Sequence, residues 1–305
     1  MLIIVVAGVA VGALLTSGHN GADHRLAGAQ THASGAAPAR SGIRERADAQ
    51  PLHASSRPSG TQPRRDTPVP ILMYHVIASP PAGAPFPGLY VPAKEFLEQM
   101  RALKSAGWHA ITMDQAIAHW HHGAPIGRGR PIVLSFDNGY RTHYTQALPA
   151  LRAMGWVGVE NLQLTGLPPS QGGLTRAQIR RLITAGWELD TQGLSHADLV
   201  ALDAAGLRAQ IAAARTTIRR RFGVDASWFC YPSGHYDATV IAAVKRAGFV
   251  GATTVVPGWA RRTQDPYRLP RLRVLGGTTG PALLRLIADT RADPPPPAYA
   301  SNASP

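Results

Sequence analysis

The stretch that decides the fold begins with the apolar run Pro131-Ile132-Val133-Leu134-Ser135-Phe136 and turns polar at Asp137-Asn138-Gly139-Tyr140. An apolar run of this length that is bounded by a turn signal indicates a buried strand. Similar runs recur along the chain and alternate with helix-like segments, which favours parallel βαβ units. The predicted strands are residues 69–77, 132–137, 157–164, 187–194, 228–231, 251–256 and 269–275.

The segments between these strands have helical periodicity, and most of them end at a glycine, which is a common helix stop. Seven strand candidates in succession favour a barrel or partial barrel over a short open sheet. In such barrels the functional side chains lie at the carboxyl ends of the strands. The predicted helices are residues 92–106, 142–154, 175–185, 203–222, 236–247 and 281–289.

The length of 305 residues allows one large domain with extensions, and a hydrophobic fraction of 45% supports a sizeable core. Residues 1–16 hold a continuous apolar stretch that predicts a signal peptide or a membrane anchor, with cleavage left open. The chain is therefore expected outside the cytoplasm, secreted or tethered. Residues 17–66 predict a disordered linker, 67–292 the folded domain and 293–305 a disordered tail.

The formal net charge of +13 favours acidic partners such as anionic cell-wall polymers, although a merely solvated basic surface is the alternative. The sequence holds no nucleic-acid-binding motif, so no nucleic acid partner is predicted. The single cysteine, Cys230, excludes an internal disulfide and is interpreted as a buried small residue. His119, His121 and His122 are interpreted as residues of a surface helix end and not as a metal cluster.

Polar side chains follow several of the predicted strands at the point where each strand ends. His75, Asp137, Asn138, Gln192 and His196 all hold such positions. A barrel would gather them at one mouth. Amide hydrolysis needs an activated water, a base, an acid and an oxyanion contact, and this set supplies those parts if a metal binds.

Five motifs in order carry a family resemblance that covers roughly residues 67–290. Residues 135–140 resemble the T-F-D-D-G-Y signature of polysaccharide deacetylases, the NodB-homology domain. Residues 191–196 resemble the S-H-T-x-S-H signature, and residues 229–234 resemble the F-A-Y-P-Y-G element. Residues 69–75 resemble the P-V-L-M-Y-H opening of the branch related to poly-N-acetylglucosamine deacetylases, and residues 265–271 match a late element of that branch.

The resemblance implies an α/β fold, a distorted (β/α)7 barrel of the NodB-homology type. It also implies a hydrolase of carbon–nitrogen bonds that removes N-acetyl groups from a cell-envelope or extracellular polysaccharide. The cofactor implied is a divalent metal, zinc or similar, that activates water. In this reading Asp137 is the general base, His75 is the general acid, and the backbone amide of Tyr231 contacts the oxyanion.

The implied metal ligands are His196, Asn138 and Gln192, and the last two depart from the family pattern, which has Asp and His there. Carboxamide oxygens are neutral and suit hard ions better than zinc, so weak or absent zinc binding is expected. The alternative to the enzyme is a catalytically silent carbohydrate-binding pseudoenzyme on the same fold. A third hypothesis is a basic cell-envelope protein that binds anionic polymers through its arginines.

Overall fold

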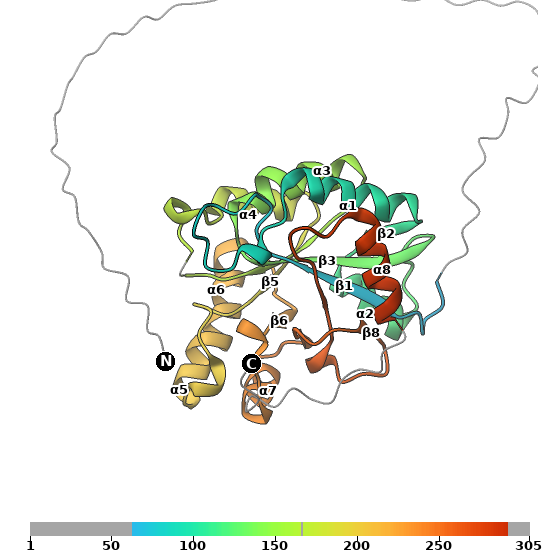
Figure 1. Cartoon of the computed structure of the whole chain (residues 1–305). Helices are drawn as coiled ribbons and strands as arrows, with labels where there is room; N and C mark the ends of the chain where they lie inside the picture. The colour runs from blue at the N-terminus through green and yellow to red at the C-terminus, as the bar shows by residue number, and fades with distance from the viewer. Residues whose placement is uncertain (1–62, 166, 292–305) are drawn as a thin grey trace, which may run out of the picture. The chain divides into compact units, whose positions relative to one another are not determined.

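The structure is a computed structural model that describes residues 63–165 and 167–291 (Figure 1). The predicted signal or anchor at 1–16, residues 17–62 of the predicted linker and the predicted tail at 293–305 lie outside these ranges. Within the described ranges, the helices are all too short or too polar to cross a membrane.

The strands alternate with helices, as the sequence predicts. The strands are β1 (Val69–Tyr74), β2 (Trp108–Ile111), β3 (Arg130–Asn138), β4 (Val159–Leu162), β5 (Glu188–Thr191), β6 (Trp228–Cys230), β7 (Gly251–Thr253), β8 (Trp259–Ala260) and β9 (Leu272–Arg273). The α-helices are α1 (Ala93–Ser105), α2 (Met113–His122), α3 (Leu148–Ala153), α4 (Arg176–Thr184), α5 (Ala204–Leu207), α6 (Ala213–Phe222), α7 (Ala238–Arg246) and α8 (Gly280–Thr290). Two π-helical segments are η2 (His143–Ala147) and η5 (Arg208–Ala212), and five short 3-10 turns are η1 (Pro87–Leu89), η3 (Pro169–Gln171), η4 (Leu199–Ala201), η6 (Pro232–Gly234) and η7 (Pro266–Arg268).

The sheet closes on itself through the last part of the folded chain. Strands β1, β3, β4, β5, β6 and β7 pair in parallel in the order β7-β6-β5-β4-β3-β1. Leu269 forms a parallel bridge with Thr253 at the end of β7, and β9 then pairs in parallel with β1. This segment joins the two edges, so the described residues form the predicted distorted (β/α)7 barrel.

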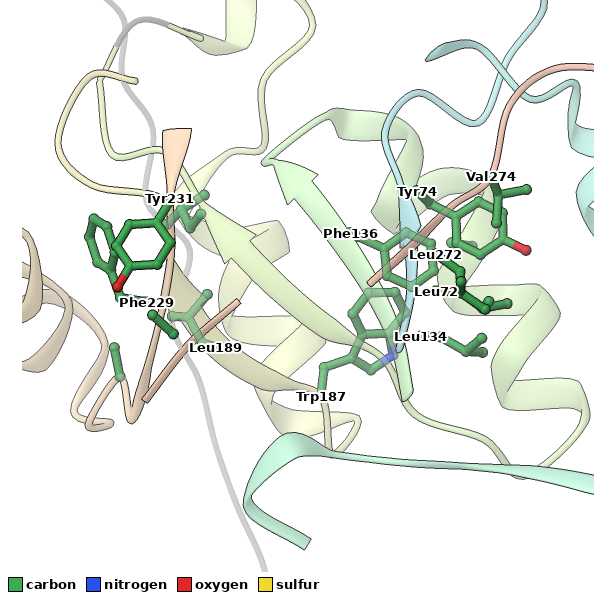
Figure 2. Close-up of a cluster of buried hydrophobic side chains, with 14 of the residues drawn as sticks. Leu72, Tyr74, Leu134, Phe136, Trp187, Leu189, Phe229, Tyr231, Leu272 and Val274 are labelled. Carbon is green, nitrogen blue, oxygen red and sulfur yellow. The ribbon is translucent and has the colours of Figure 1, made fainter. Parts of the chain in front are cut away.

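The two sides of the barrel wall have different side chains because alternate residues of a strand point to opposite faces. Val133 of β3 belongs to a buried cluster that also holds Ile71 and Trp228, inside the barrel. Leu134 and Phe136 belong to the larger cluster between strands and helices, part of which Figure 2 shows. Asp137 shares the face of Val133, so its side chain points into the barrel.

Four features of the fold differ from the sequence prediction. Strands β2 and β8 are absent from the predicted elements, because strands of four and two residues carry almost no periodicity, and of helix α2 only the end at residues 119–122 is predicted. The predicted helices at 142–154 and 203–222 each contain a π-helical segment. The predicted strand at 269–275 is regular only over β9. His119 of α2 is not at the surface: it is 4% exposed and bonds to the carbonyls of Ala124 and Arg64.

Candidate functional site

A cavity of about 390 Å³ lies at the carboxyl ends of the barrel strands. It is lined by side chains from β1, from the ends of β3 and β5, and from the loop after β6. The structure brings together there every site residue that the sequence predicts: His75, Asp137, Asn138, Gln192, His196 and Tyr231. The carboxyl ends of parallel strands meet at one mouth, which explains why residues so far apart in the sequence converge.

Backbone strain concentrates around this cavity. Among the described residues, three that are not glycine have φ in the left-handed region: Asn138 at 79°, His196 at 50° and Ser233 at 54°. All three line the cavity. Such conformations cost about 1–3 kcal/mol each and persist where the surrounding structure holds them, most often at functional sites. The strain therefore marks this cavity as the candidate site independently of any motif.

The carboxylate of Asp137 is bound by a buried arginine that lies late in the sequence of the domain. Arg271 donates from Nη1 to Asp137 Oδ1 at 2.8 Å and from Nη2 to Oδ2 at 2.9 Å, and both side chains are about 1% exposed. Asn161, which faces Asp137 across the β3–β4 pairing, donates from Nδ2 to Oδ1 at 2.8 Å. Both carboxylate oxygens thus accept charge-assisted hydrogen bonds, the strong kind.

The same contacts set the charge of Asp137. Burial by itself raises the pKa of this carboxyl, but the Arg271 charge and hydrogen bonds, with smaller help from His75 and Asn161, hold it well below its usual range. The Arg271 guanidinium is in turn stabilised in its charged form by Asp137, against the effect of burial. Asp137 and Arg271 are therefore a fixed ion pair whose charges cancel.

Cys230 contacts both Asp137 and Arg271, and its thiol is unreactive. Its side chain is fully buried, as predicted, and its Sγ lies 3.1 Å from Arg271 Nη2 and 3.7 Å from Asp137 Oδ2. Burial raises the pKa of the thiol to about 12, so the sulfur stays protonated at neutral pH.

A buried histidine–glutamate pair supports His75 from behind. His143 lies 2.8 Å from Glu160 through Nδ1 and 2.6 Å from the backbone oxygen of His75 through Nε2, where it donates. Burial, opposed by the charge of Asp137 and aided by the charges of Arg271 and Arg273, lowers the pKa of the His75 side chain to about 4. His75 is therefore neutral at neutral pH, and its buried Nδ1 has no hydrogen-bond partner among the described residues.

The three predicted metal-ligand positions offer a weak donor set. Asn138 donates from Nδ2 to Gln163 Oε1 at 3.3 Å, so its carboxamide is partly engaged already. Gln192 is 3% exposed, and its buried Oε1 has no hydrogen-bond partner among the described residues. His196 is half-buried, and burial lowers the pKa of its imidazole.

These donors do not fit a tightly held zinc or similar dication. Zinc sites in proteins use thiolates, imidazoles and carboxylates, and this cavity offers one imidazole and two carboxamides. Asp137 is the only carboxylate in the lining, and Arg271 already occupies both of its oxygens. Across the described residues, no group of three His, Cys, Asp or Glu side chains could hold a metal ion.

Tyr231 lies where an oxyanion contact is predicted, but its groups have partners. Its N–H donates to the Thr253 oxygen at 3.3 Å within the barrel wall. Its hydroxyl donates to the Tyr267 oxygen at 3.0 Å, and its ring stacks on Tyr236 with centroids 4.7 Å apart. The predicted role of the Tyr231 amide stays a prediction.

Sequence reasoning missed the residues that support the site from behind. Arg271 is quoted within a motif, but its contact with Asp137 spans 134 residues and follows only from barrel closure. Glu160 and Asn161 had a usable signal, because charged and amide residues inside the apolar run at 157–164 need buried partners.

Comparison with known proteins agrees with the fold and with the site motifs. Residues 126–252 match the family model described as Polysaccharide deacetylase. The chain is 27% identical over 214 residues to YxkH of Bacillus subtilis (strain 168), a protein named for the same family, and the match covers 70% of this chain and 74% of that protein.

Two solved structures illustrate the likeness of the fold. The Streptococcus pyogenes deacetylase PplD in complex with acetate matches with a TM-score of 0.67 at 21% identity, over 72% of this chain and 98% of that one. IcaB from Ammonifex degensii matches with a TM-score of 0.60 at 18% identity, over 74% and 99% of the two chains. At these identities the likeness concerns the fold alone.

Proposed function

We propose that this chain, which belongs to the polysaccharide deacetylase family of hydrolases, binds an acetylated polysaccharide in the cavity at Asp137 and has lost the metal-dependent hydrolysis that the family resemblance implies. The cavity keeps the shape and the strained backbone of a functional site. Its mixed lining of aromatic, aliphatic and a few polar side chains suits a sugar ring.

The observation that carries this proposal is the donor set of the cavity. Carboxamides at Asn138 and Gln192 take away one negative charge and one imidazole from the implied metal site. The remaining carboxylate, Asp137, is neutralised by Arg271. Losing a group that only supports a ligand lowers metal affinity by about 10–100-fold, and losing two ligands directly should lower it further.

A second candidate function is N-acetyl hydrolysis with a weakly held metal. It is favoured by one observation: Asp137, His75 and His196 line the same cavity, so the predicted base, acid and remaining ligand stay together. A metal, if bound, would supply an activated water there. The strong ion pair keeps Asp137 charged, which a base requires, but a carboxylate with so low a pKa is a weak base.

The cellular setting is also a proposal. The apolar stretch within residues 1–16 and the net charge of +13 support a place outside the cytoplasm, near an anionic envelope.

The test uses the full chain, equilibrated with zinc and dialysed. We expect well below one zinc per chain by elemental analysis. We also expect no acetate release from chitotetraose, and chitotetraose binding by calorimetry that EDTA leaves unchanged. The double variant Asn138→Asp with Gln192→His should bind zinc, because it restores the missing charge and imidazole.

The natural chain and its Asp137→Asn variant separate the two candidates. Stoichiometric zinc binding, together with acetate release that disappears in Asp137→Asn, would overturn the proposed loss of hydrolysis and establish the second candidate function, N-acetyl hydrolysis. Absence of any oligosaccharide binding, with or without zinc, would overturn both.

A further inference from the structure

We propose that Arg273 makes this cavity selective for a sugar that carries an anionic group, so that the preferred glycan is acidic. The inference rests on the proposed function, because it names the class of sugar that the same cavity takes. It depends on three features of the lining: its net charge, its unpaired polar atoms and its apolar wall.

The charges in the lining leave one cation without a partner. The negative charge of Asp137 is cancelled by Arg271 at 2.8 and 2.9 Å. The other ionic side chain in the lining is Arg273 of β9, which is exposed and makes no hydrogen bond or ion pair with the described residues. The cavity therefore presents a net positive charge.

Strand β9 directs the Arg273 side chain toward the cavity. Within β9, Leu272 packs into the core between strands and helices, and neighbouring residues of a strand point to opposite faces, so Arg273 points to the barrel side. Arg271 reaches Asp137 inside the barrel, while Arg273 lies one step nearer the mouth and pairs in register with Met73. A guanidinium at that place binds a carboxylate or another oxyanion in the fork geometry that suits it best.

Unpaired buried atoms deeper in the cavity define the rest of the ligand. Gln192 is only 3% exposed, and its Oε1 accepts no hydrogen bond from the described residues. A buried acceptor without a donor costs free energy, so a ligand that brings an O–H or N–H is favoured there. Sugar hydroxyl and acetamido groups supply such donors, and an anion without them does not.

An apolar wall completes the site. Phe86 is 68% exposed although its ring is large, and it lines the same cavity together with Leu89 and Val255. An exposed aromatic at the rim of a cavity offers a flat surface for the C–H face of a sugar ring. A sugar ring that carries several hydrogen-bond donors, one apolar face and one negative group matches all three features.

The experiment measures binding of three matched tetrasaccharides to the full chain by calorimetry. The first is a hyaluronan tetrasaccharide, which has carboxylates. The second is the same oligosaccharide with its carboxyls reduced to alcohols, and the third is chitotetraose. We expect the carboxylated sugar to bind about tenfold more tightly than its reduced form, in keeping with the strength of a charge-assisted hydrogen bond. Because Arg273 is exposed, added salt should reduce the preference.

Three variants assign the preference to one residue. Arg273→Gln should bring the affinity for the carboxylated sugar down to that of its reduced form, so that the preference disappears. Arg273→Lys should keep part of the preference, since it keeps the charge without the fork. Arg285→Gln, an equal change of charge at an exposed residue of α8 outside the cavity lining, should change neither affinity.

The outcomes separate this inference from the proposed function. Equal binding of the carboxylated and reduced sugars overturns the inference and leaves carbohydrate binding intact. A preference that survives Arg273→Gln, or that Arg285→Gln reduces equally, also overturns it, because the selectivity then comes from the overall charge. Failure of all three sugars to bind overturns the proposed function itself.

Discussion

Replacing Arg271 with methionine should destabilise the barrel strongly, because it leaves Asp137 charged and buried without its partner. Both side chains are about 1% exposed, and Arg271 also donates from Nε to the Thr254 oxygen at 2.9 Å. Removing one partner of a buried ion pair costs about 3–5 kcal/mol. This is a large fraction of the roughly 5–15 kcal/mol that stabilises a typical domain.

The loss should depend on pH with a definite sign. In the natural chain the pKa of Asp137 is held low, so the pair contributes stability above the unfolded pKa of about 3.9 and loses it as the pH falls through the lower folded value. Without Arg271, burial raises the pKa instead, and the charged carboxylate destabilises the fold above about 3.9. The difference in unfolding free energy between the two proteins should therefore be largest near pH 7 and shrink towards acidic pH.

Urea unfolding followed by tryptophan fluorescence at several pH values measures this difference. Titrating groups outside the surroundings of Arg271 contribute equally to both proteins, so they cancel in it. Arg285→Met, at an exposed residue of α8, is the control and should change stability by less than about 0.5 kcal/mol. The double variant Arg271→Met with Asp137→Leu should recover most of the loss, since an apolar pair can replace a buried ion pair. A deficit that is as large at pH 3 as at pH 7, or a double variant as unstable as the single one, would refute the reasoning.

Two more predictions concern other buried polar groups of the barrel. Burial raises the pKa of Glu188 to about 7, so stability should fall as the pH rises from the unfolded pKa of about 4.3 through 7. Glu188→Gln should reduce that fall in melting temperature between pH 5 and pH 8, and an unchanged pH profile would contradict the assignment. Asn161→Leu removes the N–H that bonds to Asp137 and should cost about 1–3 kcal/mol in urea unfolding. Asn161→Asp should cost more because it sets a second carboxylate beside Asp137, and a variant as stable as the natural chain would contradict that role.

Much of the site could be located from the sequence because its residues follow strands. Asp137 and Asn138 end the clearest apolar run, and His75 follows another. Once the strands are predicted to be parallel, their carboxyl ends must meet, so these residues converge without any knowledge of packing. The residues that were missed, such as Asn161 and Arg271, act through partners far away along the chain, and local patterns say nothing of such contacts.

By itself, the sequence determined the alternation of strands and helices, the place of the cavity and the two altered ligand positions, because periodicity, glycine stops and residue identity are local properties. Only the tertiary structure decided what Asp137 does. The closing segment with Leu269 bridges β7 to β1 and thereby carries Arg271 inside the barrel, where it cancels the one carboxylate of the cavity. It also sets Arg273 at the mouth. The net charge of a site is the sum over residues that closure brings together, and for that reason it cannot be deduced from any single stretch of chain.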